Sequence, residues 1–70
     1  MHKFSPALIE LMRNALEEVM AGVPLEHSTP AIKAYLAEYI LRAAAQGQTN
    51  YEALIASAAD QLQIAISMFT

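Results

Sequence analysis

The residue types that carry acid–base or metal chemistry are sparse in this sequence. His2 and His27 are its only histidines, and neither has a second potential ligand at the spacing typical of a metal site. Glu26 precedes His27, but a general base needs an oriented partner and a pocket, which adjacency in sequence does not supply. The sequence also lacks a glycine-rich phosphate loop and a nucleophile elbow. We therefore predict no catalytic residues, no metal, no cofactor and no enzymatic activity.

The most localised polar cluster consists of His27, Ser28, Thr29 and Lys33, at the start of a predicted helix. Free backbone N–H groups and the helix dipole attract anions at such a position, and the Lys33 ammonium would add positive charge. An ordinary capped helix start contains the same kinds of residue. The cluster is therefore a hypothesis for a small anion or phosphate site.

Three segments with helical periodicity must position these side chains. Ser5-Pro6 and Thr29-Pro30 each combine a good N-cap residue with proline at the first helical position. Thr49 and Glu52 have the spacing of a capping box, in which each side chain bonds to the other residue's backbone N–H. These signals predict three helix starts.

Two glycines and a proline-containing loop predict where these helices end. Gly22 is expected to adopt a left-handed C-cap after the first helix, and Gly47 is expected to end the second. Val23 and Leu25 are expected to anchor the loop that follows the first helix. We predict one all-α domain over residues 1–70, a compact three-helix bundle with helices over about 6–21, 30–46 and 50–68.

The second predicted helix is apolar on two sides, which is typical of a helix covered on both sides. Its core stripe consists of Ile32, Tyr35, Leu36, Tyr39, Ile40 and Ala43. Its second stripe consists of Ala34, Ala37, Leu41 and Ala45, and a narrow polar strip holds Glu38 and Arg42, which are four residues apart.

A lone chain of 70 residues has little room to bury both stripes, and 56% of its residues are hydrophobic. We therefore predict a two-fold homodimer, the commonest closed assembly of identical chains. The alternative is that the alanines reflect high helix propensity and remain exposed to solvent. The predicted interface consists of Ala34, Ala37, Leu41 and Ala45, with Ile64 and Met68 of the third helix as further candidates.

The overall charge argues against nucleic acid as a partner. Four Lys and Arg stand against seven Asp and Glu, so there is little positive charge to place against phosphates. Ala43 and Gly47 have the spacing of a helix-turn-helix turn, but the helix that would read DNA carries Glu52 and Asp60 and no Lys or Arg. The sequence therefore argues against DNA binding by this helix.

The N-terminal apolar stretch is interrupted by Glu10 and Arg13, so we expect no secretory signal. No apolar run approaches the roughly 20 residues that cross a bilayer, and there are no cysteines. We expect a soluble, cytoplasmic protein without a membrane partner.

Three function classes remain open. The first, which we prefer, is a non-catalytic interaction or regulatory module that acts as a homodimer and presents acidic residues such as Glu10, Glu17 and Glu18 to another protein.

The second is a small-molecule or lipid binder with a pocket between the helices, near the tyrosines or near Met12 and Met20. Tyr35, Tyr39 and Tyr51 are otherwise core residues whose hydroxyls bond at the rim of the bundle. The third is a nucleic-acid-associated regulator, whose positive patch would combine Arg13, Lys33 and Arg42 of different subunits.

Overall fold

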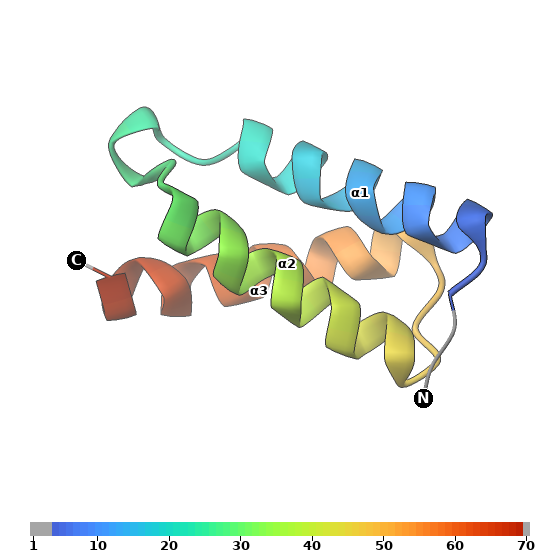
Figure 1. The fold of residues 1–70 in the computed structure, drawn as a ribbon. Helices are drawn as coiled ribbons and strands as arrows, with labels where there is room; N and C mark the ends of the chain where they lie inside the picture. Colours follow the sequence, from blue (N-terminus) through green and yellow to red (C-terminus); the bar gives the residue numbers. More distant parts are fainter. Residues whose placement is uncertain (1–3, 70) are drawn as a thin grey trace.

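Three α-helices and one short 3-10 helix make up the computed structural model, which describes residues 4–69. Successive α-helices run in opposite directions, and all three pack against one another (Figure 1). The elements are α1 (Pro6–Ala21), η1 (Leu25–His27), α2 (Pro30–Ala45) and α3 (Tyr51–Phe69). The three-helix prediction is confirmed, and every predicted helix boundary lies within one residue of the observed one.

The first two helices start where the sequence predicts. The Ser5 hydroxyl accepts a hydrogen bond from the Leu8 N–H at 3.1 Å, and the Thr29 hydroxyl accepts one from the Ile32 N–H at 3.2 Å. Proline follows each cap as the first helical residue, where its missing N–H costs nothing. Both N-cap predictions are confirmed.

The third helix starts differently from the prediction. Asn50 is its N-cap residue, because the Asn50 side-chain oxygen accepts a hydrogen bond from the Ala53 N–H at 2.9 Å. The helix begins at Tyr51, so Glu52 is its second residue and not its third. The predicted capping box of Thr49 and Glu52 is therefore wrong.

Gly47 ends α2 in the way the sequence predicts. Its φ of 100° lies in the left-handed region that favours glycine. The Gly47 N–H donates to the Ala44 carbonyl at 3.0 Å, and the Gln48 N–H donates to the Ala43 carbonyl at 2.9 Å. This pair of bonds is a Schellman motif, which satisfies carbonyls at the end of the helix and turns the chain toward α3.

The end of α1 departs from two predictions. Gly22 has a φ of −90°, so it is not a left-handed cap; its N–H instead donates to the Val19 carbonyl at 3.1 Å and tightens the last turn. Val23 is buried and anchors the loop as predicted, but Leu25 is 90% exposed. Leu25 begins η1, whose single turn directs this side chain into solvent instead of toward the core.

The core lies where the three helices meet. On α2 the buried residues recur at every fourth position, from Ile32 to Ala44, and the predicted core residues Tyr35, Tyr39 and Ala43 are half-buried. Four buried residues are alanines, whose single methyl group allows close approach of neighbouring helices. The buried residues are Ala15, Val19, Val23, Ile32, Leu36, Ile40, Ala44, Leu54, Ala58 and Ala65.

Candidate functional site

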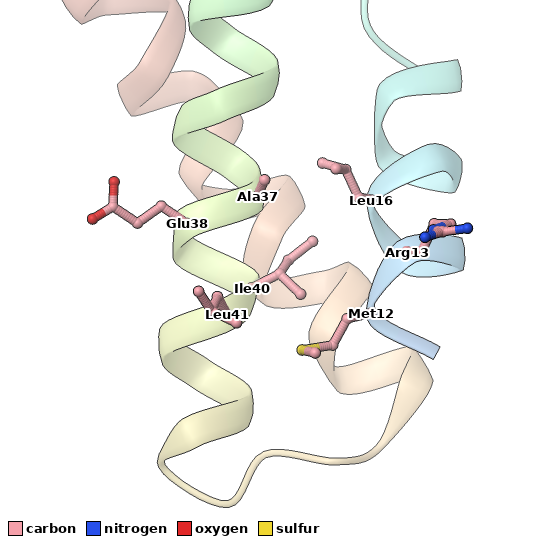
Figure 2. Close-up of a pocket in the computed structure, with 7 residues that line it drawn as sticks. All are labelled: Met12, Arg13, Leu16, Ala37, Glu38, Ile40 and Leu41. Atoms are coloured by element: carbon pink, nitrogen blue, oxygen red, sulfur yellow. The ribbon is translucent and has the colours of Figure 1, made fainter. Parts of the chain in front are cut away.

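An apolar groove runs between α1 and α2. Met12 and Leu16, about one turn apart on α1, point toward α2, and Ile40 points back toward α1 (Figure 2). Ala37 and Leu41 complete the α2 wall. The groove has a volume of about 320 Å³.

The shape of the groove follows from the sizes of these side chains. Ala37 is small and half-buried, so it leaves space between the helices where a larger residue would fill it. Leu41 is 46% exposed and forms the edge of the α2 wall, while Ile40 is buried at the base. On α1, Ile9 extends the row of Met12 and Leu16 by one turn toward the N-terminus and is 44% exposed. A continuous apolar surface therefore faces solvent along the groove between α1 and α2.

Opposite charges flank the groove. Arg13 extends from the outer side of α1, and Glu38 extends from the outer side of α2, at about the same level along the groove (Figure 2). A carboxylate oxygen of Glu38 accepts a hydrogen bond from Arg42 at 2.7 Å, which is the ion pair expected from their spacing. Arg13 has no ion pair within residues 4–69. The α1 side of the groove therefore carries an unpaired positive charge.

The structure brings together only part of the predicted dimer interface. Ala37 and Leu41 line the groove, whereas Ala34 and Ala45 do not contribute to its lining. Ile64 and Met68, which are 48% and 61% exposed, belong to α3, and the groove is lined by α1 and α2 alone.

The α1 wall of the groove is the part that sequence reasoning missed. Met12 and Leu16 belong to the broad apolar face of α1, which is predicted from its periodicity as a core face. The structure leaves both side chains half-buried. Leu16 lies toward one edge of that face, but Met12 lies near its middle, so periodicity alone gives no signal that both side chains stay half-buried.

Two tyrosines bond at the rim of the bundle as predicted. The Tyr35 hydroxyl donates to the Gln61 side-chain oxygen at 3.0 Å, and its ring meets Phe69 edge-on with ring centres 6.3 Å apart. The Tyr51 hydroxyl donates to a Glu18 carboxylate oxygen at 3.0 Å and lies 3.3 Å from the Asn14 carbonyl oxygen. Desolvation, the hydrogen bond to Glu18 and the charge of that carboxylate raise the pKa of Tyr51 above its ordinary value.

A second hollow, of about 400 Å³, lies at the turn between α2 and α3. Its polar groups come from amides, hydroxyls and the exposed backbone of the turn, and it contains no charged side chain. Its lining residues are Tyr39, Ala43, Gln46, Gly47, Gln48 and Ser57. The hollow therefore lacks the apolar lining and the charges of the groove.

The predicted anion site is a normally capped helix start in the structure. The Thr29 hydroxyl is used by the Ile32 N–H, and the backbone N–H of Thr29 donates to the His27 carbonyl at 2.9 Å. The N–H groups of Ser28 and Lys33 also donate to backbone carbonyls, at 3.2 and 3.0 Å. The backbone donors of the four predicted residues that the structure describes are thus largely occupied, and the anion site stays a prediction.

The chemistry-bearing residues are dispersed. In the part of the chain that the structure describes, no three His, Cys, Asp or Glu side chains come close enough to hold a metal ion. His2 lies outside the described residues. A bilayer-spanning helix is not found among residues 4–69, since each helix there falls short in length or in hydropathy.

Comparisons with known proteins add no family to these observations. The chain matches no protein-family model, no curated protein and no solved structure significantly. The function must therefore be inferred from the surface of the molecule, and its most distinctive feature is the apolar groove between α1 and α2.

Proposed function

We propose that this protein is a small, non-catalytic interaction or regulatory module that acts as a cytoplasmic homodimer. The apolar groove between α1 and α2 forms the contact between its two copies. The exposed row of apolar residues along this groove is the observation that carries the proposal. Burying such surface is the main favourable term in most protein association.

The two groove walls explain why α2 is apolar on a second side. Ala37 and Leu41 are not needed for the core, which is filled by the row from Ile32 to Ala44. Leu41 can enter an apolar depression on another molecule, and small alanines beside it allow close helix approach. A second copy provides a matching depression, because it carries the same groove.

The second candidate function is binding of a small apolar molecule in the same groove. Its volume of about 320 Å³ lies at the lower end of the roughly 300–1,000 Å³ of ligand pockets, and its lining is apolar. Ligand pockets, however, cover most of the surface of their ligand, and the wall at Leu41 is about half exposed. A wide protein surface covers such an open groove better, so we favour the homodimer.

A nucleic-acid role receives less support. It would need a positive patch built from Arg13, Lys33 and Arg42, and the charge of Arg42 is balanced by Glu38 at 2.7 Å. The net charge of the chain is −3.

Light scattering on the purified protein tests the proposal. We expect the wild type to have twice the chain mass at micromolar concentration and Leu41→Glu to be a monomer, because a carboxylate would be desolvated in the contact. Ile64→Glu is the matched control, since Ile64 has nearly the same exposure as Leu41 but lies on α3, outside the groove. We expect this control to remain a dimer. A monomeric wild type would refute the proposal.

A further inference from the structure

We infer that the two copies meet with their two-fold axis along the groove, so that α1 of each copy lies on α2 of the other and Arg13 pairs with Glu38 of the partner subunit. This inference rests on the proposed homodimer and adds its geometry and the charges that select it.

The two walls of the groove have different charge. The α1 side ends in Arg13, which has no ion pair within residues 4–69, and the α2 side ends in Glu38. The two side chains point away from each other on opposite sides of the groove, at about the same level along it (Figure 2). The charged groups that line the groove are therefore Arg13 on the α1 side and Glu38, which is paired with Arg42, on the α2 side.

Only two simple two-fold arrangements place one groove on another with the helices aligned. With the axis along the groove, α1 faces α2 of the partner subunit, and each Arg13 faces Glu38 of the partner subunit. With the axis across the groove, like helices face each other, and Arg13 then lies near Arg13 of the partner subunit. Opposite charges attract and like charges repel, so the first arrangement is favoured.

The apolar groups also match in the first arrangement. Leu41 on the α2 wall then faces the α1 wall of the partner subunit, where Met12 and Leu16 of the partner subunit are only half-buried. Methionine side chains are flexible and adapt to the shape of a neighbouring residue. Two reciprocal ion pairs thus flank one continuous apolar contact.

Glu38 can bind Arg42 of its own helix and Arg13 of the partner subunit at the same time. It holds Arg42 of its own helix through one carboxylate oxygen, and a carboxylate accepts several hydrogen bonds through its two oxygens. Arg13 then gains a partner that its own chain does not provide in the part the structure describes.

Reversing the two charges in separate chains tests the arrangement. Arg13→Glu leaves both flanks negative, and Glu38→Arg leaves both flanks positive, so each variant alone repels its own copies. Exposed pairs are individually weak, and we expect each variant to dimerise about tenfold less tightly than the wild type. In a mixture of the two, both flanking contacts become attractive again, and we expect the heterodimer to dominate in native mass spectrometry.

Glu26→Arg is the matched control for Glu38→Arg. It makes the same change of net charge at an exposed position of η1, outside the groove lining. Mixed with Arg13→Glu, it should give no excess of heterodimer over the statistical amount. Far-UV circular dichroism of every variant verifies that the helices are retained, and added salt should reduce the preference for the heterodimer.

The outcomes separate this inference from the proposed function. A dimeric wild type whose two charge variants mix statistically overturns the arrangement and leaves the homodimer in place. A monomeric wild type overturns both, and binding of a fluorescent apolar probe to that monomer would assign the groove to a small ligand. Dominant heterodimer formation in the mixture, without it in the control, supports the arrangement.

Discussion

Leu36→Ala and Leu41→Ala remove the same atoms from one helix at sites of opposite burial. Leu36 is 0% exposed and lies in the core cluster, whereas Leu41 is 46% exposed at the edge of the groove. The pair therefore separates what the core contributes to stability from what the groove contributes.

The expected magnitudes differ for the two sites. Leu36→Ala should lower the free energy of unfolding by about 2–5 kcal/mol, the range for buried leucines that leave a cavity. A chain of this length has a total stability of about 4–10 kcal/mol, so Leu36→Ala removes a large share of it. In a single copy, Leu41→Ala should cost only about 1 kcal/mol, because half of this side chain is already in solvent.

Urea unfolding followed by far-UV circular dichroism measures both effects. In a homodimer, the stability of the wild type rises with protein concentration, and Leu41→Ala should weaken that dependence while Leu36→Ala keeps it. Measurements at concentrations about a hundredfold apart make the comparison. A loss below about 1 kcal/mol for Leu36→Ala, or equal losses at both positions at every concentration, would refute this reasoning.

Three further predictions concern the rim, a cap and a turn. The raised pKa of Tyr51 means that the folded chain holds the phenolic proton more tightly than the unfolded chain does, which stabilises the fold while Tyr51 is protonated. This stabilisation is complete below the ordinary tyrosine pKa and is lost as pH rises through the pKa of the folded chain. Tyr51→Phe should therefore reduce the loss of stability between neutral and strongly alkaline pH, and an unchanged alkaline transition would contradict this. Asn50→Ala should lower stability by about 1 kcal/mol in thermal unfolding, more than Thr49→Ala, and the reverse order would restore Thr49 as the cap. Gly47→Ala should lower the melting temperature because φ is 100° there, whereas Gly22→Ala, at −90°, should be nearly neutral; equal shifts would argue against the left-handed turn.

Helix positions were predictable because their signals are local. At Ser5 and Thr29 one cap residue stands directly before a proline, and both starts were predicted correctly. At the third start two neighbouring residues, Thr49 and Asn50, are both good caps, and periodicity does not choose between them. The observed turn, with Gly47 in the left-handed conformation, places Asn50 as the cap.

Features that depend on how the helices cross were less predictable. The second apolar stripe of α2 is visible in the sequence, because Ala37 and Leu41 recur at helical spacing. The packing of α1 determines which residues face that stripe across the groove. No local signal in the sequence indicates which residues these are. For the same reason the exposure of Leu25 was missed, since hydrophobicity does not reveal the direction in which a short turn points.

The buried alanines act as spacers that determine how far apart the helices stand. Ala15 lies next to the groove-lining Leu16 on α1, yet it is completely hidden from solvent. A larger residue at Ala15 would push neighbouring helices apart and alter the width of the groove without changing any atom on its surface. The width of this groove can therefore change during evolution through a residue that is itself hidden from solvent.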